Sequence, residues 1–299
     1  MKVRKAVVPV AGLGTRMLPA SKAIPKEMLV VVDKPLIQHV VEEIAGAGIE
    51  EIILVTRSGK ESIENHFDSN YELEAELEKK NKTSILETIR STLPNGVSIT
   101  SVRQASAQGL GQAIACASSA VHNEPFAVLL PDVLVTPKNE GDTNDLKLMI
   151  DQFESTGASQ ILVDAVPKEI VDRYGVVDCH GAEVSVGNNA AIFSLVEKPT
   201  PEAAPSNLAV VGRYVLHPEI MPILQSTERG AGNEIQLTDG IDALIRKHPV
   251  VAHLMVGETY DCGNRQGLLE AGIYLGLKRP EYRDSLVKLI RELAAKLEP

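Results

Sequence analysis

A glycine turn near the amino terminus carries two cations at a spacing suited to a phosphate. The segment AGLGTRMLPASKAIPKEML begins at Ala11, and it places Arg16 and Lys26 after Gly12 and Gly14. Glycines leave backbone N–H groups within reach of an anion, and the cations balance the charge of its oxygens. The turn therefore predicts a phosphate site, with an ordinary tight turn and solvated cations as the alternative.

Two better-known phosphate motifs fail in this segment. Gly12 and Gly14 begin a G-x-G-x-x-G dinucleotide pattern, but its sixth position is Met17. The second predicted strand ends in Thr56 and Arg57, where a dinucleotide site needs an acidic residue. No Gly-Lys-Ser/Thr follows at the Walker spacing either. A dehydrogenase is therefore the weakest alternative.

Asp132 follows an apolar run, residues 126–130, through Pro131. This order puts a carboxylate at the carboxyl end of a predicted strand, beside the phosphate turn. Magnesium prefers few carboxylates together with phosphate oxygens and water. Asp132 is thus a candidate Mg²⁺ ligand, and a turn or helix cap is the alternative.

The elements that must position these residues read as alternating strands and helices. Residues 5–10 and 51–56 are apolar strands, and residues 35–47 and 62–67 follow them with helical patterns. The runs 52–55 and 126–130 are apolar without alternation, as in strands covered by helices on both faces. We predict an α/β fold with a doubly wound, mainly parallel, Rossmann-like sheet, whose ligands collect at the carboxyl ends of the strands.

Two helical segments lack an obvious place in this core. Residues 71–90 have a thin apolar stripe among many charges, which fits a mobile flap, an oligomer contact or a solvated surface helix. Residues 282–297 repeat Leu286, Leu289, Ile290, Leu293 and Leu297 on one face. That face must cover a groove on its own domain or a neighbouring subunit.

Composition narrows the class of protein. The 299 residues are 44% hydrophobic and 23% charged. The net charge is −10, so we expect no nucleic-acid partner, and an anionic ligand needs local cations or Mg²⁺. Three separated cysteines and seven histidines show no zinc spacing. With no signal peptide and no apolar run of spanning length, we expect no membrane association and a cytoplasmic location.

The phosphate turn is the first of nine motifs that, in this order, resemble the sugar-nucleotide pyrophosphorylases. The others are Val102-Arg103-Gln104, Gly109-Leu110-Gly111-Gln112-Ala113, Leu130-Pro131-Asp132-Val133, Tyr174-Gly175-Val176-Val177, Val196-Glu197-Lys198-Pro199, Gly212-Arg213-Tyr214, Glu234-Ile235-Gln236-Leu237-Thr238-Asp239 and Tyr260-Asp261-Cys262-Gly263-Asn264. The form ending PKEML is similar to the bacterial members that use UTP and glucose 1-phosphate. Nine short motifs in the family's order are hard to obtain by chance.

The resemblance implies an activity and an organisation. A phosphate oxygen of glucose 1-phosphate would attack the α-phosphorus of UTP, giving UDP-glucose and pyrophosphate with Mg²⁺ as cofactor and no nucleophilic side chain. It also implies a homo-oligomer, a dimer or tetramer. We expect a catalytic domain over residues 1–263, with a nucleotide half of about 1–135 and a sugar-phosphate half of about 136–263, and oligomer-forming helices over 264–299.

The resemblance also implies roles for individual residues. Arg16 and Lys26 would hold the β and γ phosphates of UTP, and Lys198 would neutralise the phosphate of glucose 1-phosphate. Asp132 and Asp261 would hold the metal, although a turn role for Asp261, which follows the predicted strand 251–256, fits nearly as well. The implied nucleotide contacts are Ala11, Gly12, Gly14, Thr15, Glu27, Gln104 and Gly109, and the implied sugar contacts are Gly175, Glu197, Asn207 and Gly212.

Two other functions stay open. A sister nucleotidyltransferase that uses dTTP or another sugar phosphate would share the turn and the metal ligands, although the PKEML form and the 71–90 insert argue against it. A catalytically weak regulatory paralogue would be expected to have altered Thr15 or Arg16, and both are intact.

Overall fold

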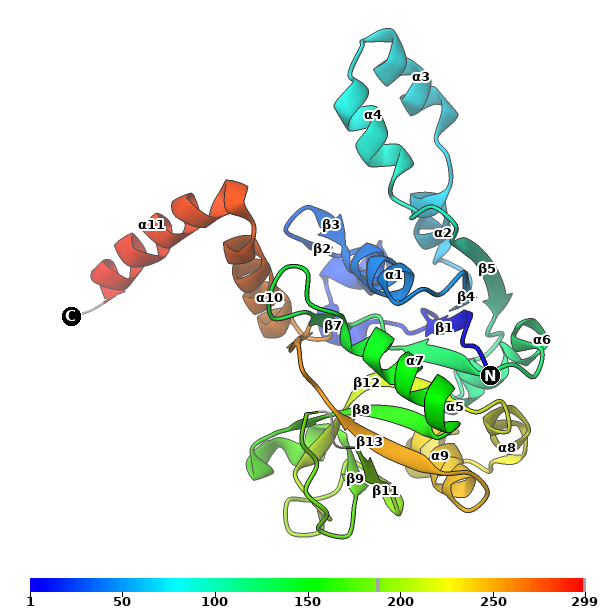
Figure 1. Ribbon diagram of the computed structural model, residues 1–299. Helices are drawn as coiled ribbons and strands as arrows, with labels where there is room; N and C mark the ends of the chain where they lie inside the picture. The colour runs from blue at the N-terminus through cyan, green and yellow to red at the C-terminus, as the bar shows by residue number, and fades with distance from the viewer. Residues whose placement is uncertain (187–188, 298–299) are drawn as a thin grey trace.

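A ten-stranded sheet crosses the body of the protein in the computed structural model, which describes residues 1–186 and 189–297 (Figure 1). The main path runs β10-β13-β8-β12-β6-β1-β4-β5, with β9 pairing both β12 and β11. Its strands are β1 Lys5–Pro9, β4 Glu51–Thr56, β5 Ser98–Arg103, β6 Phe126–Leu129, β8 Ser159–Ala165, β9 Gly175–Asp178, β10 Ala190–Ala191, β11 Ser194–Glu197, β12 Leu208–Leu216 and β13 Val250–Leu254.

Most of the long strands run in one direction. β6, β1, β4 and β5 pair in parallel, as do β8 and β13, whereas β12 is antiparallel to β6 and β8. Within β1, Ala6 and Val8 enter one hydrophobic cluster and Val7 enters the other, because successive side chains point to opposite faces. Both faces of β1 are therefore buried, as in a strand covered by helices on both sides.

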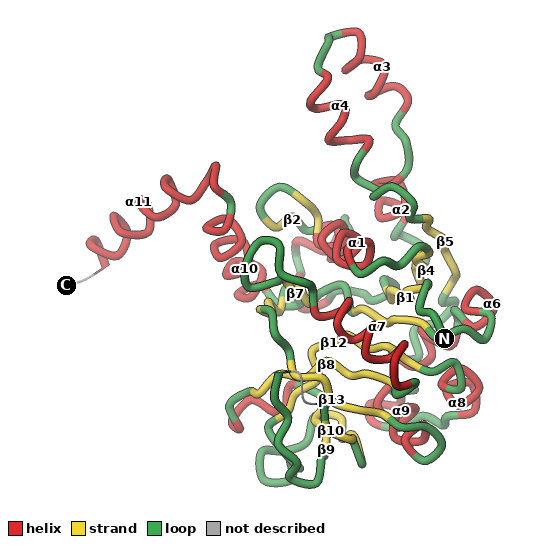
Figure 2. The backbone as a smooth tube through the Cα atoms, viewed as in Figure 1, coloured by secondary structure: helices red, strands yellow, loops and turns green. Residues whose placement is uncertain are grey.

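Helices cover the two faces of the sheet (Figure 2). Helices α1 (Leu36–Gly46) and α7 (Asp145–Thr156) contribute to one cluster, and α5 (Leu110–Ala115), α8 (Ile220–Ser226) and α9 (Leu237–Ile245) contribute to the other. The short α6 spans Ser118–Val121. The predicted doubly wound, mainly parallel α/β fold is thus confirmed.

A small second sheet corrects one expectation about Asp261. The sequence placed this residue in a loop after a strand over 251–256, but β13 ends at Leu254 and a separate strand, β14 (Glu258–Asp261), follows. β14 pairs antiparallel with β7 (Val133–Thr136). Asp261 therefore lies opposite Val133, which is the residue that follows Asp132 in the sequence. The sequence pattern did not predict this strand because most residues of β14 are polar. A further pair, β2 (Val30–Val31) and β3 (Lys34–Pro35), precedes α1.

Two helical segments extend from the body (Figure 1). After α2 (Glu61–Phe67), helices α3 (Tyr71–Lys79) and α4 (Thr83–Arg90) form a projecting hairpin, joined by an ion pair between Arg90 and Glu74 of 2.8 Å. Helix α10 (Arg265–Lys278) packs near β14, and α11 (Pro280–Leu297) then leaves the body without burying any residue. Among the described helices, none has the length and apolar character to cross a membrane.

Candidate active site at the carboxyl edge of the sheet

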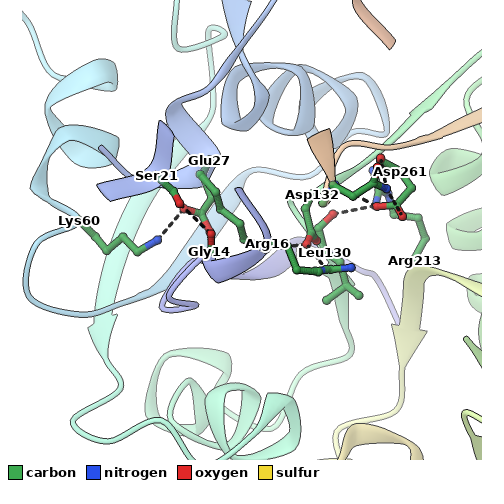
Figure 3. Close-up of polar contacts among 12 residues, drawn as sticks. Gly14, Arg16, Ser21, Glu27, Lys60, Leu130, Asp132, Arg213 and Asp261 are labelled. Atoms are coloured by element: carbon green, nitrogen blue, oxygen red, sulfur yellow. Dashed lines mark hydrogen bonds and ion pairs between the residues drawn. The ribbon is translucent and has the colours of Figure 1, made fainter. Parts of the chain in front are cut away.

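The glycine turn after β1 folds back on the segment that carries Lys26. Gly14 has a left-handed φ of 67°, and a Cβ there would lie 3.2 Å from Cβ of Lys26 and 3.3 Å from Cβ of Ser21. Ser21 Oγ donates a hydrogen bond of 2.7 Å to the Gly14 carbonyl (Figure 3). Only glycine allows both the left-handed φ and the close approach of these two side chains. Short 3-10 helices then follow over Thr15–Met17, Ala20–Lys22 and Lys26–Met28.

Asp132 meets both predicted cations. Lys26 Nζ donates to Asp132 Oδ2 at 2.6 Å, and Arg16 Nη2 lies 3.5 Å from the same oxygen, with the Arg16 side chain 66% exposed. Burial by itself raises the pKa of the Asp132 carboxyl, but the charge and hydrogen bond of Lys26, with the charge of Arg16, outweigh burial. The pKa therefore lies below its ordinary value, and Asp132 is an anion at neutral pH.

Asp261 faces the same small space as Asp132. A Cβ on Gly263 would lie 2.9 Å from Asp132 Oδ2, 3.0 Å from Asp261 Oδ1 and 2.9 Å from Arg16 Nη2. The Asp261 carboxylate is oriented by the Gly263 N–H, at 2.9 Å, and by Asn264 Nδ2, at 3.0 Å. Asn264 in turn caps α10 by accepting from the Gly267 N–H. The turn after β6 and the end of β14 thus bring the two carboxylates together.

These two carboxylates fit a magnesium ion. In the described residues, no group of three or more histidine, cysteine, aspartate or glutamate side chains is arranged to hold a metal. A magnesium ion between Asp132 and Asp261 would therefore take its other ligands from substrate phosphates and water, as this ion commonly does.

Glu27 is buried rather than open to solvent. It is 1% exposed, and its Oε2 accepts a hydrogen bond of 2.7 Å from Lys60 Nζ, which ties the Lys26 segment to the start of α2 (Figure 3). Its Oε1 accepts no hydrogen bond from the described part of the chain. Burial raises the pKa of Glu27, against the opposing charges of Lys60 and Lys26. Its nucleotide contact stays a prediction.

Gln104 and Gly109 lie at the carboxyl end of β5. β4 separates β5 from β1, so the distance from the phosphate turn is about two strand spacings, roughly 10 Å. Gln104 Nε2 donates to Gln112 Oε1 at 2.6 Å and to the Gly109 carbonyl at 3.4 Å. Gly109 has a φ of 107°, and a Cβ there would lie 2.5 Å from the Ile235 carbonyl oxygen. This glycine lets its loop pack closely against residues 234–236.

Gly175, Glu197 and Lys198 come together at the second predicted substrate site. Gly175 on β9 pairs with Glu197 on β11, and a Cβ there would lie 3.5 Å from Glu197 Oε2. Lys198 Nζ lies 2.9 Å from Glu197 Oε1, with 59% of the Lys198 side chain exposed. A 3-10 helix over Lys168–Arg173 precedes β9, and the Lys198 N–H donates to the Tyr174 carbonyl beside it.

The last two predicted sugar contacts, Asn207 and Gly212, lie just before β12 and within it. Asn207 precedes β12, is exposed, and donates through Nδ2 to the Val166 carbonyl at 3.4 Å. Gly212 lies within β12 at a φ of 88°, where a Cβ would be 2.9 Å from Cδ1 of Leu130. Gly212 therefore packs beneath the turn that carries Asp132. The sugar contacts of both residues stay predictions.

Sequence reasoning included Arg213 in a motif but gave it no role; the side chain is buried and contacts the turn that carries Asp132 (Figure 3). Its guanidinium pairs with Glu43 of α1 at 2.8 Å. The available signal was a single charge inside the apolar strand LAVVGRYVL, because a charge in such a place is almost always paired.

Comparisons with known proteins establish the family of this chain. The family described as nucleotidyl transferase matches residues 5–275. The chain is 54% identical to the UTP–glucose-1-phosphate uridylyltransferase of Haemophilus influenzae, over 98% of this chain and 100% of that protein. It is also 54% identical to the Escherichia coli K12 protein of the same name, over 93% and 91% of the two chains.

Solved structures give the same result. A UTP-bound UGPase from Acinetobacter baumannii is similar with a TM-score of 0.91 and 51% identity, covering 97% of this chain and 99% of that one. A UDP-glucose pyrophosphorylase complexed with UDP-glucose has a TM-score of 0.82 and 40% identity, covering 93% and 100%. The resemblance drawn from nine short motifs is confirmed: this chain belongs to the nucleotidyl transferase family, among the UTP–glucose-1-phosphate uridylyltransferases.

Proposed function

We propose that this chain transfers a uridylyl group from UTP to glucose 1-phosphate with Mg²⁺, giving UDP-glucose and pyrophosphate. The observation that carries the proposal is the meeting of Lys26, Arg16, Asp132 and Asp261 at the carboxyl edge of the sheet. Relatives that bear the name of this activity, and structures described as bound to UTP and to UDP-glucose, support the choice of substrates.

The phosphate end of the site handles charge. Arg16 offers a planar set of donors and Lys26 a point charge, and together they bind the β and γ phosphates and stabilise departing pyrophosphate. Backbone groups at Ala11, Gly12, Gly14 and Thr15 line the same turn. Asp132 and Asp261 would hold Mg²⁺, which would supply the further positive charge that a chain of net charge −10 needs near a triphosphate.

The sugar end of the site supplies the nucleophile. Lys198 orients the phosphate of glucose 1-phosphate, and Glu197 accepts hydrogen bonds from sugar hydroxyls, with Gly175 leaving room for the ring. A phosphate oxygen attacks the α-phosphorus of UTP, a new P–O bond forms, and the bond to pyrophosphate breaks in line. The nucleophile is already an anion, so no general base is required, and positioning with charge stabilisation provides the rate.

Gln104 and Gly109 bind the uracil in this proposal. Both Nε2 contacts of Gln104 are made inside the protein, to Gln112 and to Gly109, so its Oε1 is left to accept from a ring N–H. The spacing of about two strands between β1 and β5 matches the reach from a phosphate across a ribose to a base.

A pyrophosphate-release assay with UTP, glucose 1-phosphate and Mg²⁺ tests this function. Turnover that falls by at least about 100-fold in Asp132→Asn would support it, since the amide keeps the shape and removes the metal-binding charge. Preference for dTTP or for another sugar phosphate would support the sister nucleotidyltransferase instead. No turnover in the unmodified chain would favour the regulatory paralogue.

We further propose that α11 binds a second copy of this chain. Three observations support this: α11 buries no residue of its own, it exposes Leu289, Ile290 and Leu293, and a cavity of about 1680 Å³ opens beside its first turns and α10. The three free cysteines, Cys116, Cys179 and Cys262, support the proposal of a reducing, cytoplasmic location.

A further inference from the structure

Arg213 uses all of its hydrogen-bond donors inside the protein. Its Nε and Nη2 donate to the two carboxylate oxygens of Glu43, at 2.9 and 2.8 Å. Nη2 also donates to the Val133 carbonyl at 2.7 Å, and Nη1 donates to the carbonyls of Leu130, at 3.1 Å, and Gly212, at 3.5 Å. The side chain is fully buried. Five donors with five acceptors is the full capacity of a guanidinium group.

Two of these acceptors are the ends of the turn that carries Asp132. The turn runs over residues 130–133, and its own closing bond, from the Val133 N–H to the Leu130 carbonyl, is long at 3.4 Å. The guanidinium therefore bridges the two ends of the turn. Asp132 lies between these ends and points its carboxylate toward Lys26 and Arg16.

The guanidinium is itself held from a helix. Glu43 belongs to α1 and is almost as buried as Arg213, with 6% of its side chain exposed. The Glu43 backbone carbonyl accepts from Asn144 Nδ2, and Asn144 caps α7. Through Glu43, the position of the turn thus depends on two long helices, α1 and α7, on one face of the sheet.

We propose that Arg213, fixed by Glu43, is a positioning residue that sets where Asp132 lies relative to Lys26 and Asp261. Magnesium requires near-ideal octahedral geometry with oxygens at about 2.1 Å, so a carboxylate ligand displaced by a fraction of an ångström binds it less well. Partners one step behind the ligands of a metal commonly change metal affinity or activity by about 10- to 100-fold. The inference rests on the proposed uridylyl transfer.

The variant Arg213→Lys tests this role. Lysine keeps the charge for Glu43, but a single ammonium cannot replace the planar group that reaches both carbonyls. We expect kcat to fall and the half-saturating Mg²⁺ concentration to rise by about 10-fold or more, while the KM for glucose 1-phosphate changes by less than about 2-fold. A weaker change in the same direction is expected for Glu43→Gln, which keeps the shape of the partner.

Lys5→Met is the matched control. Lys5 is also a buried cation, 8% exposed, and it donates to the carbonyls of Ala120 and Val121 and pairs with Glu124 at 3.2 Å. It lies at the amino end of β1, whereas the phosphate turn follows the carboxyl end of that strand. Its loss should lower the melting temperature without changing the Mg²⁺ dependence.

Two readouts do not depend on turnover. Calorimetric titration with Mg²⁺·UTP should show a dissociation constant about 10-fold higher in Arg213→Lys than in Lys5→Met. Amide exchange at Val133 should accelerate in Arg213→Lys alone, because the turn loses its second support. If Arg213→Lys does not fold, Glu43→Gln decides by the same measurements.

The inference is overturned if these variants lower the melting temperature as Lys5→Met does and leave Mg²⁺·UTP binding and Val133 exchange at the control values. Arg213 would then only stabilise the fold. Absence of turnover in the unmodified chain is a different failure, since it would contradict the proposed function while the binding and exchange measurements still judge Arg213.

Discussion

At the scale of single residues, the site depends on charges that hold one another in place. Asp132 is partly buried, and the Lys26 ammonium keeps its pKa low and its carboxylate charged. Lys198 is different, because it is 59% exposed and contacts only its neighbour Glu197 and the Tyr174 carbonyl through described hydrogen bonds and ion pairs. A charge with so little structural use is free to bind a ligand.

Lys198→Ala should therefore separate the two substrates. The backbone at Lys198 already has a positive φ of 46°, which costs alanine about as much as lysine, so the fold should change little. We expect kcat/KM for glucose 1-phosphate to fall by about 100-fold, while the dissociation constant of UTP stays within about 3-fold.

Steady-state kinetics with calorimetric UTP binding measures both quantities. Lys168→Ala, which removes an exposed lysine from the 3-10 helix before β9, serves as the control and should leave both unchanged. Equal losses for the two substrates would contradict a role at the sugar phosphate.

At the scale of elements, strand ends and helix starts bring the carboxylates together. β6 and β1 are parallel neighbours, so the Asp132 turn and the glycine turn leave the sheet at the same edge. β14 pairs with β7, and the cap of α10 at Asn264 orients Asp261 toward Asp132. Gly263 lies between β14 and α10 and keeps the space between the carboxylates open.

Gly263→Ala should fill that space. The φ of Gly263 lies outside the left-handed region, so the backbone accepts alanine, but the methyl group would come within 3.0 Å of both carboxylates. We expect turnover to fall by about 100-fold, because the carboxylates or Arg16 must shift, with a change in unfolding free energy below about 2 kcal/mol.

Gly272→Ala in α10 is the paired control for this prediction. A Cβ at Gly272 meets open space, so full activity and a gain of about 0.5–1 kcal/mol from helix propensity are expected. Kinetics and urea unfolding of both variants provide the comparison. An active Gly263→Ala would argue against a metal or phosphate between Asp132 and Asp261.

At the scale of the whole molecule, two features concern stability and assembly rather than chemistry. His253 is 6% exposed on β13, and burial lowers its pKa, although the charge of Asp145 opposes this. Helix α11 exposes an apolar face that the described body does not cover.

His253 makes the protein less stable in mild acid. Because its pKa is lower when folded than the ordinary value of 6.5, the unfolded chain binds a proton first as pH falls. The stability that this residue contributes is present above pH 6.5 and is lost as pH falls toward the folded pKa. The contribution of His253 to the slope of unfolding free energy against pH is at most about 1.4 kcal/mol per pH unit.

Urea unfolding between about pH 7.5 and about pH 5.5 measures that slope, which His253→Leu should reduce. Gly272→Ala, whose added Cβ meets open space and which removes no titratable group, should not change it. An unchanged slope in His253→Leu would show that other groups set the acid limit.

Leu293→Glu tests assembly through α11. The side chain is 48% exposed in the single chain, so a charge there should not disturb the fold. In an interface between copies it would be buried without a partner, and sedimentation velocity should then show dissociation toward single chains. Glu292→Gln on the same helix should sediment like the unmodified protein. An unmodified protein that sediments as a single chain would contradict the proposal.

The sequence by itself determined the parts that depend on local chemistry. The Gly14 turn was readable because only glycine adopts its conformation, and β4 and β6 were readable because strands buried on both faces are apolar without alternation. Motif order also gave the family, now confirmed by relatives over nearly the full chain. The predicted roles of the individual site residues stay predictions.

The tertiary structure alone decided which distant residues meet. Arg213 lies 170 positions from Glu43, and no local pattern in either segment names the other as its partner. The same holds for β14, whose polar residues become a strand only because β7 provides a partner. Pairings of this kind depend on the packing of the whole chain, so the support of the Asp132 turn by Arg213 became visible only in the folded molecule.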